Sequence, residues 1–440
     1  MTVARAPHLR SAGVILTTAS LVAIAFATLM PEPAIAVQSH FCLVCGSFGT
    51  VDVILNVILF VPLGIGLALS DATGKRAIIA MCALSALIET AQFFVIPGRD
   101  STIGDVVTNT LGGALGFAIG RYAQVWLRPS PRIARFFAAG WAMIWLAIQV
   151  ISSFGFAVML PDSQYYGQIA RALGKNLAVF PGRVLNASVG DVQIPNTALS
   201  DHGKVRQLLL DGATVFATVI PSGRTSEIAP IVRIADPKRN EIVLLAQKGE
   251  YLVFGVRTGA QMLRLRPSLF ALPDAFPARD SIAAMSNDAL RLSGQYAASG
   301  VTVSAESRPG GRDRHISVVA SLGWTFWLPF QWFIEGTRAE LALSWIWTAS
   351  LMIPLAYWTF RINGSSWSQT VVEEWPPIFL GGAALLSAGL ILVPHAFGLS
   401  AAPFRDWLAT LAGVVVGAGL SAVSQLIGKR AFSDGKVGRA

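Results

Sequence analysis

The chain of 440 residues is poor in charge, since only 13% of its residues are Asp, Glu, Lys or Arg, about half the share found in ordinary soluble domains. Apolar residues make up 53%, and several apolar runs reach the roughly 20 residues that a helix needs to cross a bilayer. These features exclude an ordinary soluble protein. The sequence predicts a polytopic α-helical membrane protein.

Cysteine is also scarce, and three residues cannot supply a disulfide framework. Cys42 and Cys45 form a C-x-x-C after the first apolar run, where we favour a small extracytoplasmic disulfide over a redox or metal-binding pair. Cys82 lies within an apolar run and is expected to pack there. The sequence has no His/Cys ligand set and no phosphate-cradling glycine loop, so we expect neither a metal nor a cofactor.

Basic patches interleaved with aromatic residues are missing, and nucleic acid is therefore not an expected partner despite the net charge of +9. Arg and Lys cluster instead in short loops, as the positive-inside rule predicts for cytoplasmic loops. On this basis both termini are cytoplasmic, and we favour a retained first helix over a signal peptide cleaved near residues 34–36. About eight crossings are predicted, at 12–30, 51–69, 76–95, 104–126, 136–159, 341–360, 376–396 and 403–427.

Residues 161–315 lack long apolar runs. Charged residues return there, Pro and Gly recur, and alternation replaces the helical period, a pattern typical of strands separated by turns. We expect an inserted, extracytoplasmic antiparallel β-sandwich. Its predicted strands are 213–220, 231–235, 241–247, 251–257, 261–266 and 301–306.

The segment 322–334 is crowded with Trp and Phe around Pro329. It is short for a crossing, and Trp-rich segments favour the headgroup region, so an interfacial position is predicted. That choice also keeps the basic C-terminus inside. The predicted domains are 1–135 with four crossings, 136–160 with a fifth, 161–315 for the β domain, 316–335 for the interfacial segment, 341–428 with three crossings and 429–440 for a basic tail.

The last three crossings repeat a pattern of the earlier ones. L-F-V-P-L at 59–63 matches L-M-I-P-L at 351–355, an offset of 292 residues (351 − 59). A second match has an offset of 301 (406 − 105), because the inner loop at 361–375 is longer. Four crossings followed by four in the same direction predict a parallel repeat. The second match pairs Asp105, Gly112 and Gly116 with Asp406, Gly413 and Gly417.

Six polar residues interrupt the apolar segments between residues 51 and 121. The topology places all six in the outer leaflet, and the spacings of three and four residues put neighbours on shared helix faces, with Ser85 extending one stripe. Such groups are costly at membrane depth and usually face protein, water or a ligand. The set is Asn56, Glu89, Gln92, Arg99, Asp105 and Asn109; in the second copy Thr348, Leu390 and Thr410 stand at or near the places of Asn56, Glu89 and Asn109.

Two interpretations of the polar set remain open. The residues pair among themselves and hold helices together, as polar side chains commonly do in membranes, or they line a pocket for a polar headgroup, a sugar or a peptide-like amide. We favour the pocket because so many polar groups are concentrated in one place. Glu89 is the candidate acid or base of an enzyme, but no nucleophile with an evident base accompanies it.

The motifs N-x-x-x-F-x-P-x-G from Asn56, E-x-x-Q from Glu89, Arg99, and D-x-x-x-N-x-x-G-G-x-x-G from Asp105 resemble the VanZ-like family of bacterial membrane proteins. The resemblance covers roughly residues 10–125. The family is named for an accessory protein in resistance to the glycopeptide antibiotic teicoplanin, and its general biochemical activity is not established. The resemblance implies a cell-envelope role in the bacterial inner membrane without giving a reaction.

The β domain, most clearly over 233–258, is similar to laminin G-like (concanavalin A-like) jelly rolls. That fold often binds sugars, sometimes with calcium, but Asp236 and Asn240 are better explained as turn residues. We therefore assign no lectin site.

The leading hypothesis is a non-enzymatic envelope protein. Its membrane part would bind a polar or lipid-linked ligand, while the β domain contacts glycan; the expected partners are membrane lipids and an envelope glycan or lipid-linked precursor. A role in glycopeptide resistance or envelope maintenance would follow. The alternatives are an enzyme or carrier acting on an envelope lipid or polysaccharide precursor, and a plain anchor that displays the β domain.

Overall fold

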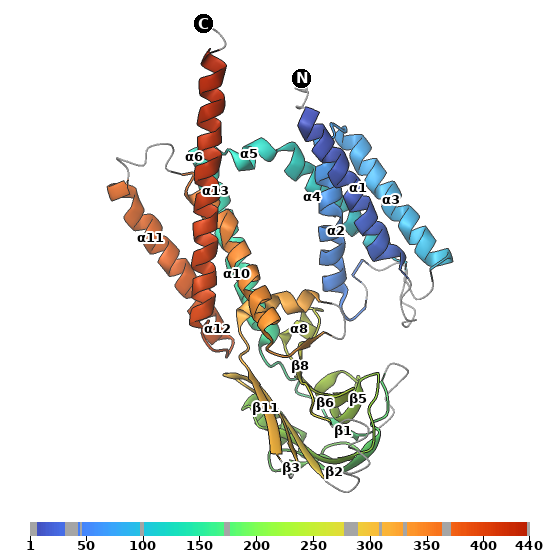
Figure 1. Ribbon diagram of the computed structural model, residues 1–440. Coiled ribbons are helices and arrows are strands. Elements are labelled where there is room, and N and C mark those ends of the chain that lie inside the picture. Colours follow the sequence, from blue (N-terminus) through green and yellow to red (C-terminus); the bar gives the residue numbers. More distant parts are fainter. Residues whose placement is uncertain are drawn as a thin grey trace. The chain divides into compact units, whose positions relative to one another are not determined.

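A computed structural model describes residues 7–30, 43–44, 46–96, 101–170, 177–276, 289–307, 310–328, 332–362 and 371–437 (Figure 1). The chain forms two compact units, the first built from residues 1–134 and 430–440 and the second from residues 135–429. Cys42, Cys45 and Arg99 lie outside the described residues, so the predicted disulfide and the arginine of the polar set stay predictions.

The first unit is a bundle of apolar helices. Its core contains Ile24, Phe60, Leu63, Met81 and Ile88, which come from the first three helices. Burying these side chains against one another leaves the outward faces apolar, as a lipid environment requires. The helices are α1 (Pro7–Leu29), α2 (Gly49–Leu69), α3 (Gly74–Phe94), α4 (Ile103–Arg121) and the short α5 (Ala123–Leu127).

The second unit contains the remaining long helices. Its helical core is formed by Trp145, Met352 and Leu390, and Trp141 Nε1 donates a hydrogen bond to the carbonyl of Leu351 at 2.7 Å. A π-helical turn, η2 (Ala388–Leu392), interrupts one crossing. The other elements are α6 (Pro131–Phe156, which begins in the first unit), α10 (Arg338–Thr359), α11 (Val371–Ser387), α12 (Val393–Ala396) and α13 (Phe404–Val437).

Seven helices among the described residues are long and apolar enough to cross a membrane, which confirms a multi-pass helical membrane protein. The one predicted crossing outside these seven is that at 104–126, which is present as helix α4, close to its predicted bounds. It is not among the seven, since Asp105, Asn109 and two threonines lower its hydropathy.

Glycines bring α2 and α4 into direct contact. A Cβ atom on Gly112 or Gly116 would overlap the carbonyl oxygen of Val57 or Val61. In the second unit, a Cβ atom on Gly413 or Gly417 would overlap the carbonyl oxygen of Ala349 or Ile353 in the same way. The glycines differ by 301 residues (413 − 112, 417 − 116) and their partners by 292 (349 − 57, 353 − 61), the two offsets that the sequence predicts. The helix pairing of the repeat is thus confirmed.

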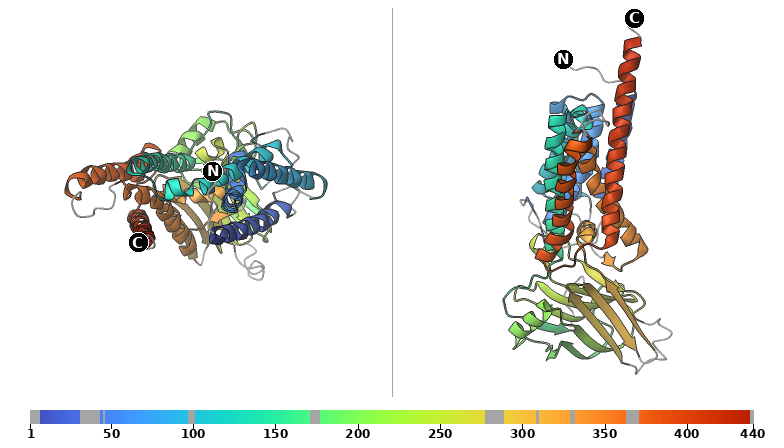
Figure 2. Two further views of the ribbon diagram at one scale, coloured as in Figure 1. Left: turned by 90° about the horizontal axis from the view of Figure 1, so that it is seen from above. Right: turned by 90° about the vertical axis from the view of Figure 1, so that its left-hand side faces the viewer.

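The inserted domain is an all-β structure of two six-stranded sheets, ordered β1-β5-β6-β7-β8-β12 and β11-β10-β9-β4-β2-β3. Within the second unit the strands gather at one end and the helices at the other (Figure 2). The sheets pack face to face, because a Cβ on Gly294 of β9 would overlap the ring of Phe254 in β7. The described strands are β1 (Tyr166–Ile169), β2 (Gly182–Val189), β3 (Val192–Gln193), β4 (Val215–Pro221), β5 (Ala229–Ala235), β6 (Glu241–Lys248), β7 (Tyr251–Val256), β8 (Leu269–Leu272), β9 (Leu290–Ala297), β10 (Gly300–Ser307), β11 (Gly310–Ile316) and β12 (Phe333–Ile334).

One predicted strand is wrong. Residues 261–266 belong to the short helix α8 (Gly259–Met262) and the turn after it, because Thr258 and Gln261 form a capping box that starts a helix. Helix α7 (His202–Leu210) and strands β1, β2, β3, β8, β9, β11 and β12 are elements that the sequence pattern did not reveal.

The aromatic segment forms the 3₁₀ helix η1 (Ala320–Trp327) and then strand β12. Residues 320–326 of η1 are buried in the protein, with Phe326 packed on Phe156 at a ring distance of 4.5 Å. An interfacial depth for this segment stays a prediction. The structure adds that its first part fills a space between elements instead of lying on the surface.

Candidate functional site

Five of the six predicted polar residues come together at one end of the first unit. Asn56 lies on α2, Glu89 and Gln92 on α3, and Asp105 and Asn109 on α4. Hydrogen bonds within this group and to Ser85, Thr102 and Thr28 link all four long helices of the unit. The convergence expected from spacing is therefore present for the described members of the set.

The link between α2 and α4 is a short hydrogen bond, with Asn56 Nδ2 donating to Asp105 Oδ1 at 2.6 Å. Asp105 is held in place by the start of α4. Thr102 is the N-cap, and its Oγ1 accepts from the backbone N–H of Asp105 at 3.1 Å. The close α2–α4 packing through Gly112 brings the Asn56 amide within reach of this carboxylate.

The links between α3 and α4 involve both carboxylate and amide groups. Glu89 Oε2 accepts a hydrogen bond from the backbone N–H of Thr102 at 2.8 Å, and Ser101 lies beside the carboxylate. The Glu89 carboxylate therefore pairs with a backbone N–H at the start of α4 that has no partner within the helix. Asn109 Nδ2 donates to Ser85 Oγ at 2.9 Å. Ser85 thus takes part in the site, as its place on the Glu89 stripe predicts.

Gln92 ties α3 to α1. Its Nε2 donates to the backbone carbonyl of Thr28 at 2.9 Å. Because a carbonyl can only accept, this bond fixes which end of the amide points at α1, and Oε1 is the end that is not used in it. No sequence signal identifies Thr28, since its contribution is a backbone atom.

The site has more buried hydrogen-bond acceptors than donors. Gln92 and Asn109 are only 7% and 2% exposed, yet Gln92 Oε1 and Asn109 Oδ1 have no hydrogen-bond partner among the described residues. Glu89, 7% exposed, adds a carboxylate, and Asp105 adds a second. A bound group that donates hydrogen bonds would satisfy these oxygens. Among the described residues no cluster of three or more His, Cys, Asp or Glu could hold a metal ion.

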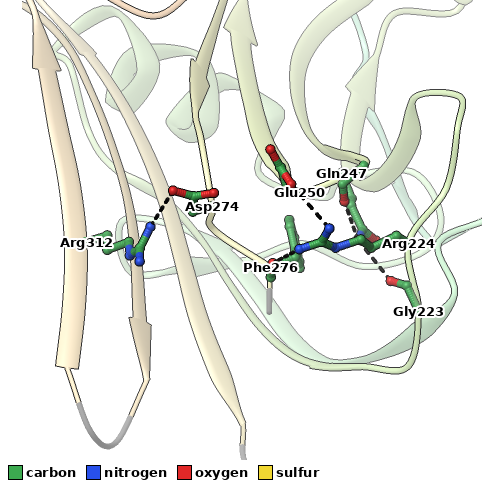
Figure 3. A network of polar contacts seen from close by, with 8 residues as sticks. Gly223, Arg224, Gln247, Glu250, Asp274, Phe276 and Arg312 are labelled. Carbon is green, nitrogen blue, oxygen red and sulfur yellow. Dashed lines mark hydrogen bonds and ion pairs between the residues drawn. The ribbon is translucent and has the colours of Figure 1, made fainter. Parts of the chain in front are cut away.

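The other candidate site is a hollow of about 580 Å³ on the second unit. Tyr251, Trp332 and Phe333 supply aromatic surface, and Arg224, Lys248 and Glu335 supply charge. Arg224 is fixed by Glu250 at 3.2 Å and by the carbonyl of Phe276 at 3.0 Å, as Figure 3 shows. Aromatic faces beside hydrogen-bonding groups are a common arrangement for small polar ligands.

Asp236 and Asn240 make hydrogen bonds that are typical of turn residues. Asp236 Oδ1 accepts from the backbone N–H of Asn240 at 2.8 Å and Oδ2 accepts from its side chain at 2.8 Å. The two residues therefore hold the β5–β6 connection together, in agreement with the interpretation from the sequence.

Comparison with known proteins bears on the first unit alone. No curated protein and no solved structure matches the chain. Residues 8–126 match the VanZ/LLP1 family, and this stretch contains the whole polar set. The membrane segment that builds the candidate site is therefore VanZ-like.

Proposed function

We propose that the protein is a non-enzymatic component of the bacterial cell envelope. Its VanZ-like segment binds a polar ligand, the headgroup of an envelope lipid or of a lipid-linked precursor, in the outer half of the inner membrane. The observation that supports this most is the surplus of buried acceptors, Gln92 Oε1 and Asn109 Oδ1 beside two carboxylates.

Helix association alone accounts for only part of the site. The bonds from Asn56 to Asp105, from Asn109 to Ser85 and from Gln92 to Thr28 join helices. Leaving a buried acceptor unpaired costs about 1–3 kcal/mol, and a purely structural role does not need one. A ligand that donates hydrogen bonds explains both the bonds that are made and the oxygens left over, with Arg99 expected to face an anionic part of the ligand.

The β domain is proposed to contact glycan through the hollow beside Tyr251 and Trp332. Trp332 is 47% exposed, so its ring is accessible to a sugar face, and the charged side chains of Lys248 and Glu335 line the same hollow. A role in envelope maintenance follows, with a change in teicoplanin susceptibility on deletion as its readout.

The test is mass spectrometry of lipids and glycans that remain bound to the purified protein in native-membrane particles. Wild type is compared with Glu89→Gln and Arg99→Ala, and with Asp406→Asn as a matched control. Asp406 is also a buried carboxylate, 2% exposed, but it lies in the first turn of α13 in the second unit. We expect a species retained by wild type and the control and reduced at least tenfold in the two site variants.

Equal lipid content in all four proteins would show that the polar set only joins helices. The enzyme alternative rests on Glu89, a buried carboxylate at the site. It is favoured if wild type chemically alters the retained species during incubation and Glu89→Gln binds the species without altering it.

A further inference from the structure

The repeat allows the candidate site to be compared with its counterpart in the second unit. The matched glycine contacts of α2–α4 and α10–α13 put Asp406 in the place of Asp105 and Thr348 in the place of Asn56. The counterpart keeps one of the two carboxylates, and buried Leu390 lies near the place of Glu89.

The two aspartates differ in how they are covered. Asp105 is partly exposed, whereas Asp406 is 2% exposed. Ser321 of η1 lies next to the Asp406 carboxylate. Neither Ser321 Oγ nor Asp406 Oδ2 completes a well-formed hydrogen bond, so the hydroxyl lies beside the carboxylate without being fully engaged.

Helix η1 packs closely against serine side chains of α10 and α6. Trp324 Nε1 donates to Ser344 Oγ on α10 at 2.9 Å, and a Cβ on Gly323 would overlap the Ser152 side chain of α6. Ser344, in turn, is the counterpart of Asp52 by the offset of 292 (344 − 52). In the second copy of the repeat, Ser321 of η1 therefore lies next to Asp406, and Trp324 of η1 binds Ser344.

We infer that the ligand of the first unit is a headgroup that presents neutral hydroxyls, that is, a glycerol or sugar headgroup, and that Ser321 occupies the equivalent position in the second unit. This inference rests on the proposed function. A hydroxyl both donates and accepts, so it can satisfy a carboxylate oxygen and an amide oxygen at once. The acceptor oxygens of the candidate site are of these two kinds, with carboxylate oxygens on Glu89 and Asp105 and amide oxygens on Gln92 and Asn109.

An ammonium headgroup fits the comparison less well. The cation near Asp406 is Arg405, whose Nε lies 3.6 Å from Oδ1 and makes no hydrogen bond. Its side chain is 40% exposed, whereas Ser321, the hydroxyl beside the same carboxylate, is buried. In the first unit Gly104 takes the place of Arg405 by the offset of 301 (405 − 104).

The experiment compares two probes that differ only in their hydroxyls. Dioctanoyl phosphatidylglycerol and dioctanoyl phosphatidylpropanol carry the same charge and the same chains, and their binding to the full-length protein in detergent is measured by thermal shift and native mass spectrometry. Free glycerol is a third arm that separates a lipid-bound from a free polyol. Wild type is compared with Asp105→Asn and its matched counterpart Asp406→Asn, and, in case Asp105→Asn fails to fold, with Asn56→Ala and Thr348→Ala.

We expect at least tenfold tighter binding of the glycerol lipid than of the propanol lipid by wild type, Asp406→Asn and Thr348→Ala. The difference should disappear in Asp105→Asn and Asn56→Ala. Equal affinity for the two lipids, or a loss confined to Asp406→Asn, overturns the hydroxyl inference while a bound ligand still supports the proposed function. Binding of free glycerol as tight as that of the lipid overturns the assignment to a lipid headgroup. Absence of any retained or bound lipid overturns both proposals.

Discussion

At the scale of single residues, the buried polar side chains differ in whether their hydrogen-bonding groups have partners. In the first unit Asn56 and Asp105 satisfy one another at 2.6 Å, while Gln92 keeps an unpaired oxygen. In the second unit Tyr296, 5% exposed, donates its hydroxyl to the carbonyl of Phe156 at 2.7 Å. That bond joins strand β9 to the end of α6. Fully paired groups such as Tyr296 stabilise the fold. Two of the incompletely paired groups, Gln92 Oε1 and Asn109 Oδ1, lie in the candidate site.

Tyr296 predicts a loss of stability at high pH. Burial raises the pKa of Tyr296 well above its usual value near 10, and burial also raises the pKa of Tyr165 to about 12. Because the folded state holds these protons more tightly than the unfolded state, stability is unchanged below about pH 10 and falls above it, by up to about 1.4 kcal/mol per pH unit for each group. Thermal unfolding between pH 8 and 11.5 measures this, and Tyr296→Phe should show a shallower fall. A profile identical to wild type would contradict the assignment to Tyr296.

At the scale of elements, helix pairs are set by small residues and helix starts by caps. Gly112 and Gly116 let α4 touch the backbone of α2, which places Asp105 against Asn56. The side chain of Thr102 caps α4, and its backbone N–H donates a hydrogen bond to the Glu89 carboxylate. A cap and a close helix contact thus decide the geometry of the site, although neither belongs to the set of residues that would touch a ligand.

Gly116→Ala is expected to destabilise the first unit. Its new Cβ would overlap the carbonyl oxygen of Val61 on α2, and backbone cannot move aside cheaply, so we expect a loss of about 1–3 kcal/mol. Gly417→Ala should act likewise in the second unit. Gly419→Ala is the control, since a Cβ there meets nothing within 4 Å and Ala favours a helix over Gly by up to about 1 kcal/mol. Thermal unfolding in detergent should rank the control above wild type and both others below it; equal melting of all four would refute the packing argument.

At the scale of the whole molecule, an apolar helical part and a β-sandwich share one chain. The described helices supply seven candidate crossings, and the β domain is an insertion between α6 and α10. Its sheets are held by antiparallel pairing throughout, apart from the parallel pair β8–β12. Strand β12 and η1 connect this domain back to α10, so the insertion is anchored at both ends by packed structure.

The predicted orientation is tested by cysteine labelling. In a background without Cys42, Cys45 and Cys82, Asp191→Cys in the β domain, whose native side chain is 69% exposed, should react with a membrane-impermeant maleimide in intact spheroplasts. Lys75→Cys, in the first turn of α3, should react only after permeabilisation, because basic residues at the ends of crossings stay on the cytoplasmic side. The reverse pattern would invert the topology and place the polar set in the inner leaflet.

Much of the architecture follows from the sequence because its causes are local. Helix positions follow from apolar runs of sufficient length, the β domain from alternation and turns, and the two repeat offsets of 292 and 301 residues from matching motifs. The grouping of Asn56, Glu89, Gln92, Asp105 and Asn109 follows too, since helix spacing and alternating direction leave them one common depth.

Only the tertiary structure decides which of these groups are satisfied. The pairing of Gln92 with the Thr28 carbonyl, the choice of Asp105 as partner of Asn56, and the packing of η1 over Asp406 depend on contacts between residues distant along the chain. The capping box that turns 259–262 into a helix overrides a strand-like pattern. Composition and periodicity record the preference of each residue for water, lipid or a backbone shape, whereas hydrogen-bond partners are set by the meeting of separate elements in space.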